Sequence, residues 1–377
     1  MNRFFLFLLS IFWCMAGISA NHPSSLLPLP QKYSFNGKQV NAKMAVEERI
    51  VAQIDGAKFQ EEAYHLSITP KKIILEATTP KGMYWGRQTL EQLKYTKNKK
   101  TWVPQCDITD WPAFRIRGFM HDVGRSYIPV EELKREISLL SRYKINVFHW
   151  HLTENLAWRL ECRKYPQLNA PENMEREKGK FYTLDEARQL VEFCKQHQVL
   201  LIPEIDMPGH SAAFERTFKT NMQSEKGTQI LKDIIDEVCA TFDVPYLHIG
   251  TDEVQFTNPD FVPMMVKYIR AKGKKVISYN PGWNYKPGEI DMTQLWSYRG
   301  KAQKGIPAID CRYHYANHFD TYADLVAMFN SRIYNQPEGS DDLAGCIVAF
   351  WNDRFIDNTS QLLAENNFYP YMLTLAE

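Results

Sequence analysis

From Arg115 to its end, the chain alternates short apolar runs with amphipathic stretches, and this rhythm constrains the fold more than any other feature. The amphipathic stretches carry apolar residues at helical spacing, most clearly at Val130–Tyr143, Leu184–His197, Thr228–Phe242 and Phe261–Ala271. The apolar runs predict eight strands: Arg117–Val123, Ile145–Leu152, Val199–Asp206, Tyr246–Asp252, Lys275–Tyr279, Thr293–Tyr298, Pro307–Arg312 and Cys346–Trp351. Strands that alternate with helices in this way predict an α/β fold, namely a (β/α)8 TIM barrel over residues 112–377.

The residues before the barrel follow a different pattern. His65–Thr69 and Ile73–Ala77 alternate like strands on either side of a proline turn, and Gly82–Leu93 carries apolar residues at roughly helical spacing. Pro112 biases Trp111 towards extended backbone and so marks an end to this region. We therefore expect a small α+β domain over residues 21–111.

The first twenty residues have the composition of a secretory signal peptide. Arg3 supplies positive charge, Phe4–Trp13 is apolar, and Gly17–Ala20 provides small residues for cleavage near Ala20. We therefore expect residues 1–20 to be removed from a secreted or periplasmic protein. The apolar run is too short to span a bilayer, and no later segment has eighteen apolar residues without charge, so no membrane span is expected.

Charge and cysteine content say little about partners. The 45 basic and 44 acidic residues nearly cancel, which gives no argument for nucleic acid or an anionic membrane as a partner. The cysteines after Cys14 form no CxxC pair, and most fall in predicted helices or strands, where buried thiols are expected. No pattern indicates the oligomeric state.

Polar and aromatic residues collect where the predicted strands end. In a barrel these ends meet at one rim, where the functional sites of such folds lie. The ends are His121-Asp122, His149-Trp150-His151, Glu204-Ile205-Asp206, His248–Glu253, Trp296, Arg312 and Trp351-Asn352-Asp353. A barrel that served only as a scaffold would not need this clustering, so we expect a functional site at the rim.

Asp252 and Glu253 are the leading catalytic candidates. Adjacent acids after a strand can form a solvated loop, but Gly250 leaves space beside them, and paired carboxylates are the usual equipment for cleaving glycosidic bonds. Pro208 and the glycine after it predict a tight turn that aims His210 over the barrel mouth, although a plain turn between strand and helix would also fit.

His149 and His151 point to the same face of their strand, because side chains alternate along a strand. Such a pair can bind a metal, which makes a metal-dependent hydrolase an alternative function. No third and fourth ligand follows at a convincing spacing. We therefore favour hydrogen-bonded residues beneath the site, with no metal or cofactor.

Four stretches, in order along the chain, resemble the catalytic domain of glycoside hydrolase family 20, the β-N-acetylhexosaminidases. They are Arg117–Arg125, His149–Thr153, Glu204–His210 and His248–Val254. In addition, Lys81–Leu90 is similar to a helix of the small domain that precedes the barrel in that family. The resemblance covers nearly all of the chain after residue 20.

The resemblance implies a retaining exo-hydrolase that removes terminal β-linked N-acetylglucosamine or N-acetylgalactosamine from glycans, with the substrate's own acetamido group as nucleophile and no cofactor. Glu253 would donate a proton and later act as base, Asp252 would hold the acetamido N–H, and His210 would hydrogen-bond Glu253. Trp296 and Trp351 would wall the sugar pocket, and Arg117 would bind sugar hydroxyls. The residues expected to bind substrate are Arg117, Asp206, His151, Glu154, Trp158, Tyr279, Trp296, Tyr313, Trp351 and Asp353.

Several positions depart from the family pattern around the sugar pocket. Thr251 stands in place of the second glycine of Gly-Gly-Asp-Glu, and Glu154 replaces an Asp that supports the active-site histidine. Tyr279 replaces a common Trp, and either Tyr313 or Tyr315 could replace a tyrosine that follows the seventh strand. The acid pair is intact, but these changes keep a second function open: a glycan-binding protein with weak or no turnover.

Overall fold

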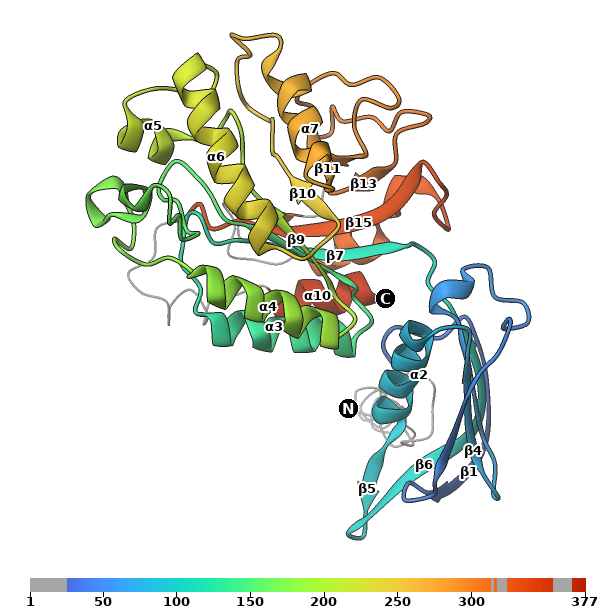
Figure 1. The fold of residues 1–377 in the computed structure, drawn as a ribbon. Helices are drawn as coiled ribbons and strands as arrows, with labels where there is room; N and C mark the ends of the chain where they lie inside the picture. The colour runs from blue at the N-terminus through green and yellow to red at the C-terminus, as the bar shows by residue number, and fades with distance from the viewer. Residues whose placement is uncertain (1–25, 313–314, 317–323, 355–367) are drawn as a thin grey trace, which may run out of the picture. The chain divides into compact units, whose positions relative to one another are not determined.

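The computed structural model describes residues 26–312, 315–316, 324–354 and 368–377. The expected signal peptide and Tyr313 lie outside the described residues. The chain divides into two compact units after Pro112 (Figure 1).

The first unit is a mixed sheet with one long helix. The strand order is β1-β6-β3-β4-β2, and β5 pairs with β6. Helix α2 (Pro80–Leu93) starts where the Thr79 side chain accepts a hydrogen bond from the Gly82 backbone N–H, and it buries Met83, Trp85 and Leu90. The strands are β1 (Lys32–Asn41), β2 (Val46–Ile50), β3 (Tyr64–Ile68), β4 (Ile73–Ala77), β5 (Tyr95–Lys97) and β6 (Lys100–Asp110), with a short 3-10 helix at Gln60–Glu62.

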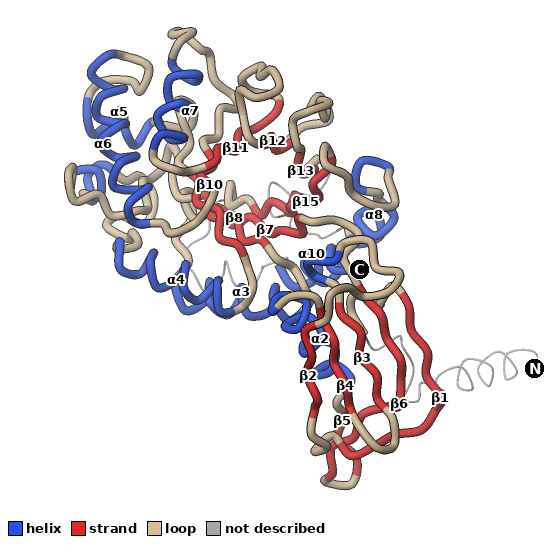
Figure 2. Tube along the Cα trace, turned by 45° about the vertical axis from the view of Figure 1, so that its right-hand side comes forward, coloured by secondary structure: helices blue, strands red, loops and turns tan. Residues whose placement is uncertain are grey.

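The second unit is a closed barrel of parallel strands, as predicted. Its last strand, β15, pairs with both β13 and β7, and this double pairing closes the ring (Figure 2). The barrel strands are β7 (Ile116–Asp122), β8 (Val147–His151), β9 (Leu200–Glu204), β10 (Tyr246–His248), β11 (Lys275–Asn280), β12 (Met292–Leu295), β13 (Ala308–Asp310) and β15 (Leu343–Phe350). The two-residue strand β14 (Tyr315–Ala316) pairs with the end of β15.

Helices cover the outside of the ring of strands except beside β12, where the connections are loops (Figure 2). Helix α4 begins with a capping box, in which the Thr183 side chain accepts a hydrogen bond from the Glu186 backbone N–H and the Glu186 side chain accepts one from the Thr183 backbone N–H. The helices are α3 (Val130–Arg142), α4 (Leu184–Gln196), α5 (Ala212–Phe218), α6 (Glu225–Thr241), α7 (Phe261–Ala271), α8 (Leu325–Asn330) and α10 (Phe368–Ala376). Short 3-10 turns occupy Pro166–Asn169, Pro171–Asn173 and Ile333–Asn335.

The predicted alternation of strand and helix is wrong at two crossovers. Residues 281–291, between β11 and β12, and residues 296–307, between β12 and β13, contain no helix. Proline and glycine recur in both segments, and these residues interrupt helical hydrogen bonding or weaken helices by their backbone freedom.

Strand side chains divide between two apolar cores. Met120, Ile202 and Ile347 belong to the core inside the barrel, whereas Phe119 and Leu201 belong to the core between strands and helices. The neighbouring residues of one strand therefore face opposite sides. By this alternation, the polar residues at the ends of β8 and β9 face the barrel axis.

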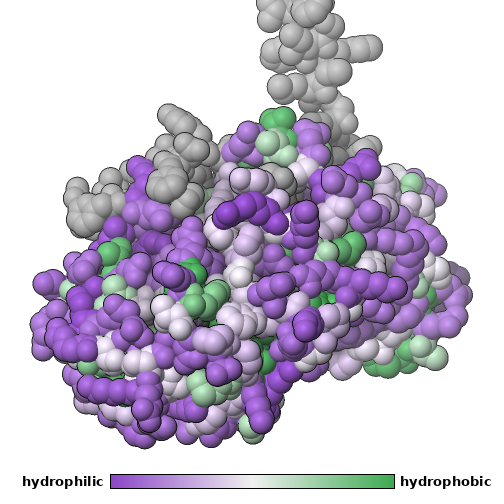
Figure 3. Space-filling view, turned by 90° about the horizontal axis from the view of Figure 1, so that it is seen from above, coloured by the Kyte–Doolittle hydropathy of each residue, from purple (hydrophilic) through white to green (hydrophobic). Residues whose placement is uncertain are grey.

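The surface is polar on the face that Figure 3 shows, where apolar residues are scattered among hydrophilic ones. No helix among the described residues is long and apolar enough to cross a membrane. Single exposed apolar residues of this kind are usual on protein surfaces.

Candidate active site

The acid pair lies on a sharp turn at the C-terminal end of β10. The strand ends at His248, earlier than predicted, because Gly250, Thr251 and Glu253 have positive φ values of 64°, 84° and 49°. A Cβ on Gly250 would lie 1.7 Å from Asp206 Oδ1, so only glycine fits at this position. The turn lifts Asp252 and Glu253 to the barrel rim.

Asp252 is a buried carboxyl beside a second one. Burial raises the pKa of Asp252 to about 6, against the lowering effect of the His210 charge. Burial and the charge of Asp252 raise the pKa of Asp206 well above its usual value. Among the residues that the structure describes, Asp252 Oδ1 and Asp206 Oδ2 have no hydrogen-bond partner. The carboxyl of Asp252 is therefore placed to accept a hydrogen bond from a bound molecule.

Glu253 is the more exposed of the two acids. Its side chain is 57% exposed, and its Oε2 lies 3.6 Å from His210 Nε2, while Asp252 Oδ2 lies 3.9 Å from the same nitrogen. His210 follows a turn in which a Cβ on Gly209 would lie 2.8 Å from the Asp252 backbone oxygen. The structure thus brings Asp252, Glu253 and His210 together, as their predicted roles require.

Glu154 supports His210 from the other side. Its Oε1 lies 2.8 Å from His210 Nδ1. Burial works against ionisation of Glu154, but His151, His210 and Arg125 hold its pKa well below the usual range. Burial likewise lowers the pKa of His210, but Glu154, Asp206 and Asp252 raise it to about 10. His210 is therefore a cation at neutral pH, held by one carboxylate and facing the acid pair.

Arg125 is a site residue that the sequence analysis missed. Its guanidinium lies 2.6 Å from Glu154 Oε1 and 2.9 Å from Asp122 Oδ2. It also lies 3.4 Å from Asp353 Oδ1 and stacks 5.0 Å from the centre of the Trp351 ring. The sequence could have identified it from its position three residues beyond the end of β7, because functional residues of such barrels lie at the C-terminal ends of the strands.

Arg117 is a correction to the predicted substrate contacts. It is the second residue of β7, and its side chain points out of the barrel, as does that of Phe119 two residues later. Its guanidinium donates hydrogen bonds to the backbone oxygens of Lys144 at 2.9 Å and Phe114 at 2.8 Å, both of which precede the strands. Arg117 therefore lies at the opposite end of the barrel from the acid pair and cannot touch the same ligand.

A buried polar cluster lies beneath the acid pair, centred on Glu204. Its Oε2 lies 2.7 Å from His149 Nε2 and 2.8 Å from His151 Nδ1, and the Tyr279 hydroxyl donates to it at 3.2 Å. His248 Nδ1 lies 3.4 Å from Oε1. Since all five residues are buried, His151 and Tyr279 support the site from below.

Three sets of described residues bring metal-ligating atoms within 4.8 Å of one another. Two of them, His149-Glu204-His248 and His151-Glu204-Asp206, are fully buried, whereas a catalytic metal needs an open position for water or substrate. The third, Asp206-His210-Asp252, is part of the acid site itself. The buried sets do not suit the metal-dependent reaction considered from the sequence.

Aromatic side chains lie on the same rim, with one exception. Trp351 packs edge-on against His151 and lies 5.9 Å from the ring of Tyr315. The Trp296 indole N–H donates to the Pro281 backbone oxygen at 2.6 Å. Trp158, predicted as a substrate contact, is instead 2% exposed within the core between strands and helices, so it has no face to offer a sugar.

Known families and structures match both units. The catalytic domain of glycosyl hydrolase family 20 matches residues 114–289, and domain 2 of the same family matches residues 24–111. The chain belongs to glycoside hydrolase family 20.

Relatives of this family 20 chain include two bacterial enzymes. It is 34% identical over 249 residues to a β-hexosaminidase of Porphyromonas gingivalis, covering 57% of this chain and 32% of that protein. It is 36% identical over 230 residues to a β-hexosaminidase of Vibrio furnissii, covering 52% of this chain and 38% of that protein. The match thus spans about a third of the length of each of these relatives.

Solved structures share the fold of this family 20 chain. A β-N-acetylhexosaminidase from Bacteroides fragilis superposes with a TM-score of 0.80 at 24% identity, covering 93% of this chain and 90% of that one. A family 20 exo-β-N-acetylglucosaminidase from Vibrio harveyi gives 0.79 at 21% identity, covering 94% and 74%.

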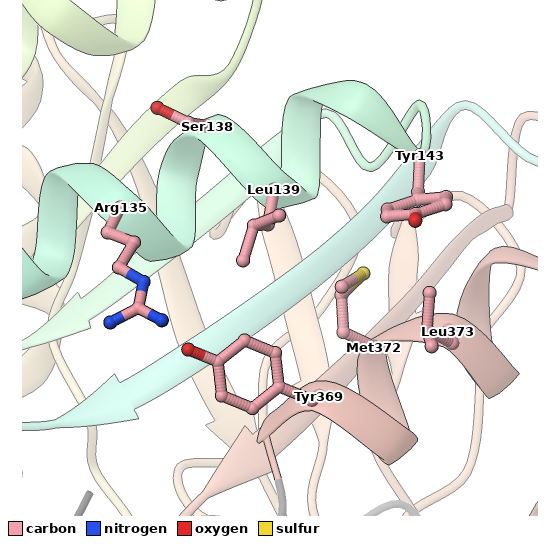
Figure 4. Close-up of a pocket in the computed structure, with 7 residues that line it drawn as sticks. All are labelled: Arg135, Ser138, Leu139, Tyr143, Tyr369, Met372 and Leu373. Atoms are coloured by element: carbon pink, nitrogen blue, oxygen red, sulfur yellow. The ribbon is translucent and has the colours of Figure 1, made fainter. Parts of the chain in front are cut away.

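Two grooves on the helical layer of the family 20 barrel contain none of the predicted site residues. One lies between α6 and α7. In the other, between α3 and α10, the Arg135 guanidinium lies 6.0 Å from the centre of the Tyr369 ring (Figure 4). Its lining is Arg135, Ser138, Leu139, Tyr143, Tyr369, Met372 and Leu373.

Proposed function

We propose that this chain is a retaining exo-β-N-acetylhexosaminidase that removes terminal β-linked N-acetylglucosamine or N-acetylgalactosamine from glycans. One observation carries the proposal: the exposed Glu253 and the buried Asp252 both lie beside His210 Nε2, while Glu154 contacts Nδ1 on the other side of the ring. An exposed acid and a buried one beside it match the two different tasks of the reaction.

In the first step, Glu253 gives its proton to the glycosidic oxygen, so that the bond from C1 to the leaving group breaks. The acetamido oxygen of the substrate attacks C1 from the opposite face and closes an oxazoline-type ring. Asp252 accepts a hydrogen bond from the acetamido N–H, and its negative charge offsets the positive charge that develops on this ring. His210 stabilises the carboxylate that Glu253 becomes.

In the second step, the Glu253 carboxylate takes a proton from water, and the water oxygen attacks C1. The oxazoline ring opens, and the acetamido group is restored. Two attacks from opposite faces leave the sugar with its original configuration. Because the substrate supplies the nucleophile, no second protein carboxylate needs to reach C1.

The sugar ring would lie between Arg125, Asp353 and the indoles of Trp296 and Trp351. Arg125 takes the role expected of Arg117, because its guanidinium lies at the rim and can fork onto sugar hydroxyls. Trp351, stacked under Arg125, would present its indole to the sugar. Tyr315, beside Trp351, would meet the acetamido group.

An assay with aryl N-acetyl-β-glucosaminide and N-acetyl-β-galactosaminide tests the proposal. We expect release of the aryl alcohol from both, unchanged by a chelator, and none from the aryl β-glucoside that lacks the acetamido group. Binding of the sugar without release would indicate a glycan-binding protein. Loss of release with chelator would indicate the metal-dependent reaction.

We also propose that the protein is exported, on the basis of Arg3, the apolar run Phe4–Trp13 and the small residues that precede Asn21. Mass spectrometry of the protein from an exporting host tests this, with an N-terminus near Asn21 expected. A retained Met1 would contradict it.

A further inference from the structure

The turn that carries the acid pair contains an unusual residue. Thr251 is fully buried with a φ of +84°, a backbone conformation that β-branched residues rarely adopt. Glycine would adopt it without strain. The threonine therefore needs contacts that hold it there.

Three buried hydroxyl groups supply these contacts. Thr251 Oγ1 lies 2.6 Å from Ser278 Oγ, and the Tyr285 hydroxyl donates to the same Ser278 oxygen at 2.9 Å. Ser278 Oγ in turn donates to the Gly250 backbone oxygen at 3.2 Å. A serine hydroxyl has one proton and two acceptor positions. Since Ser278 spends its proton on Gly250 and accepts from Tyr285, Thr251 must be a donor to Ser278, and every hydroxyl proton is then used.

The backbone of the turn is held from the same side. The Tyr279 N–H donates to the Gly250 oxygen at 2.8 Å, and the Thr251 N–H donates to Asp206 Oδ1 at 3.4 Å. Gly282 packs so closely that a Cβ there would lie 2.8 Å from both Thr251 O and Oγ1. Strand β11 and the loop after it thus clamp the residue immediately before Asp252.

We propose that Thr251 is a positioning residue for the reaction, which it serves through its hydroxyl group. The hydrogen bonds from Thr251 through Ser278 to Gly250 and Tyr285 set the turn so that Asp252 faces the acetamido N–H and Glu253 faces the leaving oxygen. This inference rests on the proposed function and deepens it, because it assigns the accuracy of the acid pair to a side chain that touches no substrate.

The test compares Thr251→Val with Thr251→Ser. Valine is β-branched and strained at positive φ, as threonine is, but it lacks the hydroxyl group. Serine keeps the hydroxyl group. We expect Thr251→Val to lower kcat by about tenfold, within the roughly 100-fold that a misplacement of 1 Å can cost, with KM changed less than about threefold. Thr251→Ser should restore kcat to within about threefold of the wild type. A purely structural residue would lower the amount of folded enzyme instead, and circular dichroism with active-site titration measures that amount.

Ser278→Ala and Tyr285→Phe extend the test to the other end of the chain of hydroxyls. Ser278→Ala should lower kcat as Thr251→Val does, and the double variant should be little worse than either single one, because both remove the same connection. If Thr251→Val does not fold, Tyr285→Phe carries the test, with a smaller loss of kcat expected. Thr251→Gly relieves the backbone but should lose kcat as valine does.

Two outcomes would overturn the inference: full kcat in folded Thr251→Val and Tyr285→Phe, or equal loss in the serine and valine variants. Neither would affect the proposed function, which is tested on the wild-type chain by release of the aryl group and by the insensitivity of that release to chelator.

Discussion

At the scale of single residues, the groups at the barrel mouth set one another's charge. Glu154 is ionised because His151, His210 and Arg125 surround it, and its charge in turn keeps His210 protonated. The replacement of the family's Asp by Glu154 was a reason to doubt turnover, but the longer arm reaches His210 at 2.8 Å. The support for His210 that the proposed general acid needs is therefore present in this chain.

Replacing the proposed general acid gives the most direct test at this scale. We expect Glu253→Gln to lower kcat on an unactivated disaccharide by about 100-fold or more, because general acid catalysis contributes roughly that much. The amide keeps the size of the side chain and cannot donate a carboxyl proton. Kinetics by product chromatography measures the loss. Glu172→Gln, a change at an exposed acid, is the matched control and should behave as the wild type does. Near-normal turnover in Glu253→Gln would contradict the assignment.

Variants of Arg125 and Arg117 distinguish a residue that binds substrate from one that stabilises the fold. We expect Arg125→Ala to lower kcat/KM by about 10- to 100-fold, since the loss of charge-assisted hydrogen bonds costs roughly 1.5–3 kcal/mol. Arg117→Ala should lower the free energy of unfolding, because the backbone oxygens of Lys144 and Phe114 lose a donor, and should leave kcat/KM of the folded protein within about twofold. Urea unfolding and steady-state kinetics on both variants check this. The reverse pattern would restore Arg117 to the site.

At the scale of secondary structure elements, the predicted ends of strands depended on backbone conformation that the apolar pattern does not contain. Tyr246–Asp252 has the pattern of one strand, yet β10 stops at His248, because Gly250, Thr251 and Glu253 have positive φ values and Gly250 packs directly against Asp206. The contact with Asp206 lies between two different strand ends, so no local pattern announces it. The missing helices after β11 and β12 did have a local signal in their prolines and glycines.

Helix α4 (Leu184–Gln196) offers a test of an element that the sequence predicted to within one residue. We expect Thr183→Ala to lower the free energy of unfolding by about 1 kcal/mol, within the range of about 0.5–2 kcal/mol for the loss of an N-cap. The side chain that accepts the Glu186 backbone N–H is removed. Thr257→Ala, at an exposed loop position, is the control and should change stability by less than about 0.5 kcal/mol. Equal effects of the two changes in urea unfolding would contradict the role of the cap.

At the scale of the whole molecule, the barrel places the buried cluster around Glu204 beneath the acid pair at its open rim. Burial opposes ionisation of Glu204, but His151, His248 and His149 hold its pKa well below the usual range. Burial lowers the pKa of His149 to about 4, whereas the charge of Glu204 raises that of His151 well above its usual value. Histidines from the two strands that flank β9 thus balance one buried carboxylate and support the acid site above it.

The acid limb of the pH profile tests the charge state of this site. Asp252 acts as an anion, and its pKa is about 6, so kcat/KM should fall as the pH falls through about 6 and its carboxyl gains a proton. Asp252→Asn should lower kcat/KM and remove this limb. Measurements of kcat/KM between about pH 4 and 8 decide it. A wild-type profile that stays flat across about pH 6 would contradict the role of Asp252 as an anion.

The amino-acid sequence by itself determined the parallel barrel, the family and the acid pair, because strand and helix periodicity and the order of adjacent residues are local properties. Only the tertiary structure decided that Arg125 replaces Arg117 at the rim, that Trp158 packs in the core and that Glu154 reaches His210. Each of these outcomes depends on which end of the barrel a side chain occupies and on contacts between segments about fifty residues apart, such as Glu154 and His210. The side-by-side pairing of β7, β8 and β9 brings the loops after these strands together, and no stretch of the chain contains those contacts on its own.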